Sequence, residues 1–386
     1  MLLGSINTYS TLGAFFVIYI ILRHLRDIIQ LDKKTFTRCL TVICVAAVAC
    51  SLIFNAFIGT IVFCIILAVL YSQLPRPLLT VANKAVLITG CDSGIVGYSL
   101  ACHLDRLGFK VFAGCKLQNS DGEKQLKSQC SDRVITLQLD VTKDEQIQHA
   151  VKFVCENMEN GEYIWGVINA ASIVRIADFE MFPTKELQRE FEVNALGQFC
   201  VCKAFIPLIR QSRGRFVNFT FSGNFASERT VAHTMSTYAV EGMSHVLRLE
   251  MKKWGVDVCM VQPPFRETDI ISESGVQDFH RCVNEEITEE QQHLYGKDYL
   301  DHLMQAVLAK TSPSITFNDL FTIANAVTEA LLSQKPCFKY HCGMDYTLYG
   351  VLSSIAPGDF IDRIGAYMVP RLSLNVTDSN VNKKDQ

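Results

Sequence analysis

The sequence contains few charged residues for its length and has no surplus of either sign. Only 19% of its 386 residues are Asp, Glu, Lys or Arg, and the formal net charge is −3. Proteins that bind phosphate backbones carry a basic surplus, so nucleic acid is excluded as the main partner. A chain that is 49% hydrophobic and nearly uncharged also cannot stay solvated and unfolded, which excludes a disordered protein. The length instead allows a sizeable core in one large domain or two small ones.

Cysteine is abundant, but the spacings that bind metals are missing. None of the 15 cysteines forms a CxxC pair, and none lies at metal-ligand spacing with a histidine. We therefore expect no metal site. We interpret the cysteines as reduced thiols, some of them buried as small hydrophobic residues.

The mean hydropathy of +0.19 is high for an enzyme, and the apolar residues concentrate near the N-terminus. Thr11 to Leu22 is uncharged and, extended back through residues 2–10, reaches ~20 residues, the length that spans a bilayer as a helix. A secretory signal peptide is disfavoured, because no basic residue precedes this run whereas Arg23 and Arg26 follow it.

A second apolar stretch, Cys39 to Pro75, contains no Asp, Glu, Lys, Arg or His. As one helix it would be roughly 55 Å long at ~1.5 Å per residue, well beyond a hydrocarbon core of ~30 Å. We therefore expect a hairpin of two short spans, with a single long tilted helix as the alternative. Residues 1–77 are thus interpreted as a membrane anchor of two or three transmembrane segments.

The charges between the two apolar stretches predict the orientation of the anchor. Five Lys or Arg residues stand there against two Asp residues, which marks this loop as cytoplasmic. With three spans the rest of the chain lies in the cytosol, and with two spans it lies in the lumen. Reduced cysteines favour the cytosol.

Beyond residue 83 the pattern changes to short apolar runs that alternate with amphipathic stretches. Continuous apolar strands alternating with helices predict a parallel sheet with helices on both faces. The expected fold class is therefore α/β, a Rossmann-like doubly wound sheet over residues 83–370, preceded by the transmembrane helices and followed by a polar tail at 371–386. Expected strands are 84–90, 110–114, 134–141, 164–172, 214–221 and 256–264, and expected helices are 98–107, 144–157, 187–210, 240–254 and 319–333.

The turn after the first expected strand is rich in glycine. It reads Thr89-Gly90-Cys91-Asp92-Ser93-Gly94-Ile95-Val96-Gly97. Such a turn lets the backbone approach a pyrophosphate, which then sits on amide groups at a helix N-terminus. We therefore expect a dinucleotide to contact Gly90, Asp92, Ser93, Gly94 and Ile95.

This turn resembles the cofactor loop of the short-chain dehydrogenase/reductase superfamily, in which TG is followed by three residues and Gly. KAVLITGCDSG with FKVFAGC is similar to one branch, that of the type 2 17β- and 11β-hydroxysteroid dehydrogenases, the retinol dehydrogenases and D-β-hydroxybutyrate dehydrogenase. LQLDVT, WGVINAAS, NALGQ, AVEGMSHVLRLEM and VQPPFRET resemble later segments of that branch. The resemblance covers residues 83–370 and implies hydride transfer between a nicotinamide and a carbonyl or alcohol.

In this superfamily a tyrosine is the general acid/base, and a lysine four residues later lowers its pKa and holds the ribose. A serine orients the substrate oxygen, and an asparagine supports a proton-relay water. Alignment around AVEGMSHVLRLEM places the tyrosine position at His233 and the lysine position at Thr237, and none of the 12 tyrosines is followed at this spacing by a lysine. The serine position falls on Thr220 or Phe221, and Asn194 stands at the asparagine position.

The resemblance also implies further cofactor contacts. The end of the second strand carries Cys115-Lys116 rather than the acidic residue of NAD enzymes, and Lys116 is either a contact for a 2′-phosphate or a solvated loop residue. The expected cofactor is NAD or NADP, although the missing lysine and the altered loop disfavour binding. The remaining expected contacts are Asp140 and Val141 for the adenine, Asn169 at the start of the family's NNAG turn, and Pro263 and Thr268 after the last core strand.

Two functions remain open. In the first, catalysis is impaired or lost because His233 and Thr237 replace the tyrosine and lysine, and the fold is kept as a scaffold for a lipid, a partner or a dinucleotide. In the second, an active NAD(P)-dependent oxidoreductase acts on a lipophilic alcohol or ketone such as a steroid or retinoid. His233 then serves as acid/base, because an imidazole of ordinary pKa, about 6.5, needs no neighbouring lysine.

The resemblance implies the surroundings of the site as well. Residues 269–349 correspond to the segment that covers the substrate, and their aromatic and aliphatic side chains suit an apolar ligand. A homodimer through the helices at 187–210 and 240–254 is expected. So is a membrane location, in the endoplasmic reticulum with the domain in the cytosol, or in a mitochondrial membrane as the alternative.

Overall fold

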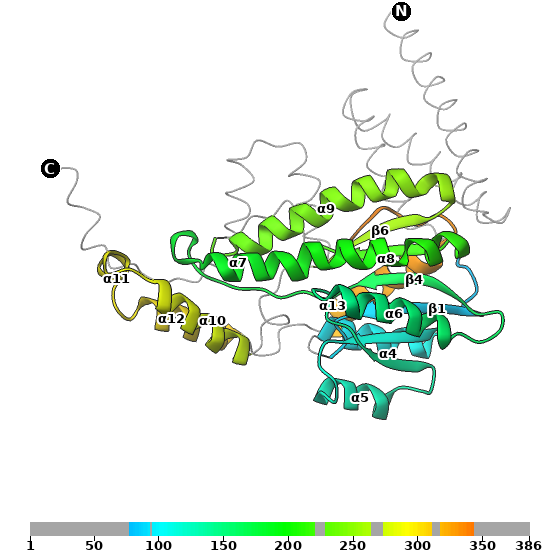
Figure 1. The fold of residues 1–386 in the computed structure, drawn as a ribbon, viewed down its shortest axis with the longest axis horizontal. Helices are drawn as coiled ribbons and strands as arrows, with labels where there is room; N and C mark the ends of the chain where they lie inside the picture. The colour runs from blue at the N-terminus through cyan, green and yellow to red at the C-terminus, as the bar shows by residue number, and fades with distance from the viewer. Residues whose placement is uncertain (1–76, 93–94, 221–227, 264–272, 311–316, 343–386) are drawn as a thin grey trace, which may run out of the picture. The chain divides into compact units, whose positions relative to one another are not determined.

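The computed structural model describes residues 77–92, 95–220, 228–263, 273–310 and 317–342 (Figure 1). The expected polar tail and, apart from Pro77, the expected membrane anchor lie outside these residues. The described residues fall into two units, the first holding 77–79 and 333–335 and the second holding the α/β domain. In the first unit, Leu78 and Ser333 form an isolated antiparallel bridge. The helices and strands named below belong to the second unit.

Within the described residues the domain is built on a parallel sheet of seven strands, in the order β3-β2-β1-β4-β5-β6-β7. Every residue of β1, β2 and β5 is buried, as expected for parallel strands covered on both faces. The expected doubly wound α/β fold is therefore confirmed. The strands are β1 Lys84–Thr89, β2 Lys110–Cys115, β3 Val134–Gln138, β4 Tyr163–Asn169, β5 Arg215–Phe219, β6 Asp257–Gln262 and β7 Lys339–His341.

Helices cover both faces of the sheet (Figure 1). On one face α4, α5 and α13 pack against the strands, and on the other face α6, α8 and α9 do so. The core beneath the second group joins Leu87, Phe112 and Phe216 of the sheet with Phe205 of α8, all of them fully buried. The bounds are α4 Ile95–Arg106, α5 Asp121–Gln129, α6 Asp144–Glu156, α8 Gln198–Ser212, α9 Val231–Met251 and α13 Phe317–Leu332.

Three further helices form a small lobe at one end of the domain (Figure 1). They are α10 (Glu273–Glu286), α11 (Glu289–Tyr295) and α12 (Tyr299–Lys310). Phe279 and Leu303 of this lobe share an apolar cluster with Ile176 and Met181 from the segment after β4, which includes the short helix η1 (Phe179–Met181). The lobe therefore occupies part of the segment expected to cover a substrate.

The long helix expected over 187–210 is interrupted. It begins as α7 (Thr184–Phe191), continues as a π-helical segment η2 (Glu192–Gly197) and ends as α8. Single π segments are frequent at functional sites, and this one carries Asn194. Within the described residues, 184–212 is the one helical stretch long and apolar enough to cross a membrane; half of its apolar window is buried inside the domain, as in a core helix.

Several expected boundaries are wrong, each for a local reason. The strand expected over 134–141 ends at Gln138, because the Asp140 carboxylate turns back to accept hydrogen bonds from the Thr142 amide and hydroxyl. The strand expected over 164–172 ends at Asn169, and the next two amides donate to the Thr89 hydroxyl. The helix expected from 240 begins at Val231, which places both His233 and Thr237 inside α9.

One helix that packs against the sheet, α5, was not predicted from the sequence. The stretch 121–129 is too polar for a clear apolar stripe, yet α5 forms there. Its N-cap is Ser120, whose hydroxyl accepts a hydrogen bond from the Glu123 amide at 3.2 Å. Capping of this kind satisfies an orphan amide of the first turn and starts the helix without help from hydrophobic periodicity.

Candidate functional site

The strand order reverses direction at β1 and β4, because successive strands extend from β1 to β3 on one side and from β4 to β7 on the other. At such a switch point the carboxyl ends of parallel strands border a crevice in which α/β folds bind ligands. The glycine turn follows β1 at this edge, and α4 begins at Ile95 directly after it. Of the expected contacts in the turn, Ser93 and Gly94 lie outside the described residues.

Two glycines make this turn geometrically possible. Gly90 adopts φ +75°, and a Cβ there would lie 2.8 Å from the Cα of Ala171. A Cβ on Gly97 would lie 2.2 Å from the carbonyl oxygen of Gly90. Any larger residue at either position would force the turn away from α4 and from the loop after β4. The turn is thus closed by backbone contacts and keeps the first turn of α4 against β1.

Asp92 is a polar side chain within the described part of the turn. Its Oδ2 accepts a hydrogen bond from the Leu117 amide at 2.8 Å, which ties the loop after β2 to the turn. Its Oδ1 is buried and has no hydrogen-bond partner among the described residues. A buried acceptor without a partner is costly, so a donor on a bound ligand would satisfy it. Asp92 therefore fits a hydroxyl of a dinucleotide ribose.

Asp140 and Val141, the expected adenine contacts, both make contacts with other residues of the domain. Burial alone would raise the pKa of Asp140, but its hydrogen bonds to Thr142 and the nearby Lys116 ammonium, at 3.8 Å, outweigh burial and lower it. Val141 is buried and packs so closely under Gly197 that a Cβ on that glycine would lie 2.6 Å from Val141 Cγ2. The end of β2 carries a buried thiol, Cys115, so a ribose 2′-hydroxyl meets no carboxylate there.

Asn169 is fully buried and serves the sheet. Its Nδ2 donates to Asn218 Oδ1 at 2.9 Å and to Cys202 Sγ at 3.2 Å, which joins β4 to β5 and α8. Its Oδ1 is buried without a hydrogen-bond partner among the described residues. Pro263 is buried directly after β6, whereas Thr268 lies outside the described residues.

Asn194 joins three parts of the site. Its Oδ1 accepts hydrogen bonds from the Ile173 amide at 2.8 Å and the Ser172 hydroxyl at 3.2 Å. Its Nδ2 donates to the Ile173 carbonyl at 2.8 Å and to the Ser236 hydroxyl of α9 at 3.3 Å. Asn194 therefore lies beside α9, the helix that carries His233 and Thr237.

His233 and Thr237 lie one turn apart on α9, and Ser236 lies between them in sequence. The three side chains are buried, with residue exposures of 4%, 7% and 0%. Thr220, directly after β5, is also buried, and its hydroxyl accepts a hydrogen bond from Gln262 Nε2 at 3.1 Å. Phe221, the alternative for the serine position, lies outside the described residues.

The sequence expectations miss a buried carboxylate beside His233. Glu190 of α7 is fully buried, and its Oε1 lies 3.5 Å from His233 Nδ1. Burial raises the pKa of Glu190, although the contacts with His233 and Arg175 oppose the rise. The other oxygen of Glu190 accepts a hydrogen bond from the Arg175 amide at 3.0 Å, so the carboxylate is held on both sides.

Arg175 extends this cluster to a second carboxylate. Its Nε lies 3.2 Å from Glu186 Oε2, and both side chains are about nine-tenths buried. Glu186 and Glu190 stand four residues apart and so share one face of α7. That spacing indicates that the two carboxylates lie side by side, but it does not predict their contacts with Arg175 and His233.

A second polar cluster ties the small lobe to the segment after β4 and to the residues that precede α9. Asp178 accepts hydrogen bonds from Arg229 Nε at 3.1 Å and from the Tyr299 hydroxyl at 2.5 Å, and Arg229 also donates to that hydroxyl at 3.3 Å. Burial and the Asp178 carboxylate raise the pKa of Tyr299 to about 12. Tyr299 is therefore a structural donor at neutral pH. The resemblance to the family instead places the tyrosine position on α9, at His233.

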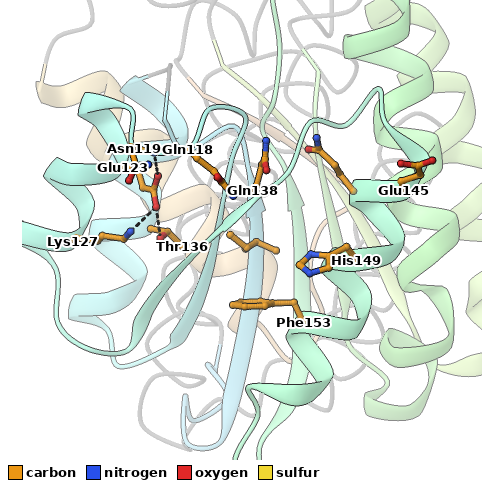
Figure 2. A pocket seen from close by; sticks show the side chains of 11 residues that line it. Gln118, Asn119, Glu123, Lys127, Thr136, Gln138, Glu145, His149 and Phe153 are labelled. Carbon is orange, nitrogen blue, oxygen red and sulfur yellow. Dashed lines mark hydrogen bonds and ion pairs between the residues drawn. The ribbon is translucent and has the colours of Figure 1, made fainter.

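An open pocket of about 580 Å³ lies at the β3 edge of the sheet, between α5 and α6 (Figure 2). On its α5 wall, Glu123 bridges Lys127, Thr136 and the Asn119 amide by hydrogen bonds. His149 lies on the α6 wall. None of Asn194, His233 and Thr237 lines this pocket. Within the described ranges, no three His, Cys, Asp or Glu side chains gather closely enough to hold a metal ion.

The parallel sheet and the glycine turn at its switch point have the arrangement that is typical of dinucleotide-binding α/β folds. The family model for short chain dehydrogenases matches residues 84–278. The chain therefore belongs to the short-chain dehydrogenase family, and its relatives place it in the branch of the 17β-hydroxysteroid, retinol and D-β-hydroxybutyrate dehydrogenases.

Three relatives illustrate this placement. Estradiol 17-beta-dehydrogenase 2 of Mus musculus is 33% identical over 296 residues, which cover 76% of this chain and 77% of that protein. The mitochondrial D-beta-hydroxybutyrate dehydrogenase of Bos taurus is 36% identical over 293 residues, covering 74% and 84%. Retinol dehydrogenase 7 of Rattus norvegicus is 33% identical over 283 residues, covering 73% and 87%.

Solved structures show the same fold. A short-chain dehydrogenase from Streptomyces avermitilis superposes with a TM-score of 0.55 at 23% identity, over 71% of this chain and 94% of that one. A short chain dehydrogenase from Burkholderia cenocepacia, solved in complex with NADP, gives a TM-score of 0.53 at 19% identity, over 74% and 98%.

Proposed function

We propose that this protein is a membrane-anchored member of the steroid, retinol and hydroxybutyrate dehydrogenase branch in which the family's tyrosine–lysine catalysis is impaired or lost. One observation carries the proposal: His233 and Thr237 occupy the two helix positions, both buried on α9. A phenol with an ordinary pKa of about 10 needs an adjacent cation to exchange protons at neutral pH. Thr237 supplies no charge and no ammonium to hold a ribose.

The fold still suits a nicotinamide dinucleotide. The Gly90 turn and the N-terminus of α4 would receive the pyrophosphate, and the unpartnered Asp92 oxygen would accept a ribose hydroxyl. When bound, NAD or NADP would supply a hydride acceptor or donor. Lys116, about half exposed beside Asp140, is the nearest cation at the end of β2. The proposal therefore includes dinucleotide binding without a choice between the two cofactors.

The ligand we propose is a lipophilic alcohol or ketone such as a steroid or retinoid. Its support is the apolar lobe of α10–α12 beside the segment after β4, and the substrates in the names of the relatives. We also propose an endoplasmic reticulum membrane with the domain in the cytosol, or a mitochondrial membrane as in the bovine relative. Phe199 of α8 and Val246 and Leu249 of α9 expose between 47% and 65% of their surface, which supports a homodimer through these helices.

The test uses the full chain in lipid nanodiscs. Calorimetry with NADH and NADPH should give binding, whereas steroids, retinoids and hydroxybutyrate should give no hydride transfer with either cofactor. The double variant His233→Tyr with Thr237→Lys should then gain activity if the rest of the site is intact. Turnover by the unmodified protein at the rate of an ordinary family member would overturn the proposed impairment.

A second function, retained oxidoreductase activity with His233 as acid/base, is favoured by the Glu190 carboxylate at 3.5 Å from its Nδ1. A carboxyl group beside an imidazole sets which ring nitrogen carries the proton and so orients the ring. In this case any turnover should disappear in His233→Ala and fall in Glu190→Gln. His245→Ala is the matched control, because His245 lies on the same helix but its side chain is 46% exposed.

A further inference from the structure

Two cysteines on neighbouring helices of the dinucleotide half lie close together. Cys102 of α4 is buried, and Cys130 is the partly buried C-cap of α5. Their Sγ atoms are 3.1 Å apart. A disulfide bond is about 2.05 Å long, so the two sulfurs need to approach by about 1 Å. We propose that Cys102 and Cys130 form an intramolecular disulfide when the domain meets a disulfide-bearing oxidant.

Hydrogen bonds on both sides of this cysteine pair hold the two backbones in place. One turn before Cys102 on α4, the Tyr98 hydroxyl donates to Gln129 Oε1 at 2.6 Å. Near the next turn, the Asp105 carboxylate accepts hydrogen bonds from the Ser131 amide at 2.9 Å and from its hydroxyl at 2.5 Å. The flanking residues on α4 share one helix face with Cys102. Closing the bond therefore requires side-chain movement rather than a shift of α4 against α5.

The surroundings favour two neutral thiols or a disulfide over a thiolate. Burial, followed by the neighbouring Cys102 thiol, raises the pKa of Cys130 to about 12. A disulfide carries no charge, so it avoids the cost of a buried anion. The same effect makes Cys130 slow to react, because the thiolate is the attacking species. We therefore expect the pair to stay reduced with mild oxidants over short times and to form its bond with an enzymatic dithiol–disulfide oxidant.

The reaction balances as an ordinary thiol–disulfide exchange. Cys130, the more exposed of the pair, loses its proton and attacks one sulfur of the oxidant's disulfide, which releases one oxidant thiolate and gives a mixed disulfide. Cys102 then loses its proton and displaces the second oxidant thiolate. The two released protons neutralise the two thiolates. The two cysteines are oxidised, and the disulfide of the oxidant is reduced to two thiols.

The bond would brace the part of the fold that is expected to hold the dinucleotide. It closes the chain from 102 to 130, a loop that contains the end of α4, all of β2 and all of α5, which begins at Asp121. At that start, Gly122 packs on Asp92 so closely that a Cβ on the glycine would lie 2.2 Å from the Asp92 carbonyl oxygen. Cross-linking a loop of this length restricts the unfolded chain and stabilises the fold. Because cytosolic reductants keep thiols reduced, the state of the pair would also report which side of the membrane the domain faces.

The experiment treats the full chain in nanodiscs with protein disulfide isomerase and oxidised glutathione, followed by alkylation and tryptic mapping. Peptide 85–106 carries Cys91 and Cys102, and peptide 128–133 carries Cys130. The expected result is a linked pair of these peptides, lost on reduction, together with a rise of several degrees in the midpoint of thermal unfolding. Cys91→Ser should keep the link.

Two variants and one control decide the assignment. Cys102→Ser and Cys130→Ser should each abolish both the link and the thermal shift. Cys155→Ser, which removes an exposed cysteine, should change neither. The proposal is overturned if unmodified protein yields no 85–106 to 128–133 link after oxidation, if Cys130 ends only as a glutathione adduct, or if the link survives Cys102→Ser. The peptide link and the thermal shift depend on neither ligand binding nor turnover, so the disulfide proposal can fail or succeed independently of the proposed function.

Discussion

The buried pair of Arg175 and Glu186 offers a quantitative test of the charge cluster under the site. Replacing Arg175 with Met keeps the volume and the backbone amide that binds Glu190, but removes the guanidinium 3.2 Å from Glu186. Breaking a buried ion pair costs about 3–5 kcal/mol, because the remaining charge stays buried without compensation. The half-exposed Arg189, 3.5 Å from the other Glu186 oxygen, partly compensates, so we expect a loss near the lower bound, about 3 kcal/mol.

Thermal unfolding of the full chain in nanodiscs measures this loss. At about 2–4 °C per kcal/mol for a domain of this size, the midpoint for Arg175→Met should fall by about 6–12 °C. Arg189→Met is the matched control, because it removes the exposed partner of the same carboxylate and should cost less than about 1 kcal/mol. Adding Glu186→Leu to Arg175→Met should restore most of the midpoint. Equal effects of the Arg175 and Arg189 variants would refute the buried-pair reasoning.

Three further predictions concern the turn, the helix ends and the core. Gly97→Ala should abolish dinucleotide binding in calorimetry or unfold the domain, because the new Cβ would lie 2.2 Å from the Gly90 carbonyl oxygen. Gly242→Ala is the control: no atom lies within 4 Å of the position of its Cβ, so the substitution should stabilise α9 by about 0.5–1 kcal/mol in thermal unfolding. Burial alone would raise the pKa of Asp105, but the interactions with Ser131 and Arg133 lower it overall. The Asp105 carboxylate therefore stabilises the folded protein above its pKa in the unfolded chain, about 3.9, and this stabilisation is lost as the pH falls through its lower pKa in the folded protein. Asp105→Asn should therefore lower the unfolding midpoint at pH 7 and converge with the unmodified protein in acid; a constant difference at all pH values would contradict this account. Phe112→Ala should cost about 3–5 kcal/mol in the same assay, since the ring is fully buried.

The central sheet could be predicted from the sequence because its strands are short, continuous apolar runs. In β1, β2 and β5 every position is buried, so burial imposes the same hydrophobic requirement along the whole strand. The short, partly buried strand β7 was not predicted. Strand ends were predicted less well, since they depend on side chains that reach the backbone from elsewhere, such as the Thr89 hydroxyl that receives the two amides after Asn169. The helix α5 escaped prediction because a cap and charged pairs define it, whereas hydrophobic periodicity does not.

The site was predictable where the family pattern fixes it and unpredictable where this chain adds its own contacts. Asn194 and the α9 positions follow from the motif spacing, and the structure brings Asn194 into contact with α9 through Ser236. Of the two cluster residues Arg175 and Glu190, Glu190 is the nearer to His233 in the sequence, and 43 positions separate them. Only the packing of α7 against α9 brings these side chains together, and nothing in the spacing of the sequence encodes that contact.

That cluster changes how the loss of the tyrosine–lysine pair is understood. A neutral filler at the tyrosine position would suffice for a scaffold, yet α9 presents an imidazole to a fully buried carboxylate. Burying Glu190 is costly unless it is protonated or paired; burial raises its pKa, and the contacts with His233 and Arg175 oppose the rise. Glu190→Gln therefore separates the two proposed functions. If the pair is structural, the amide should leave ligand binding intact and alter stability alone; if it serves proton transfer, turnover should fall by more than binding does.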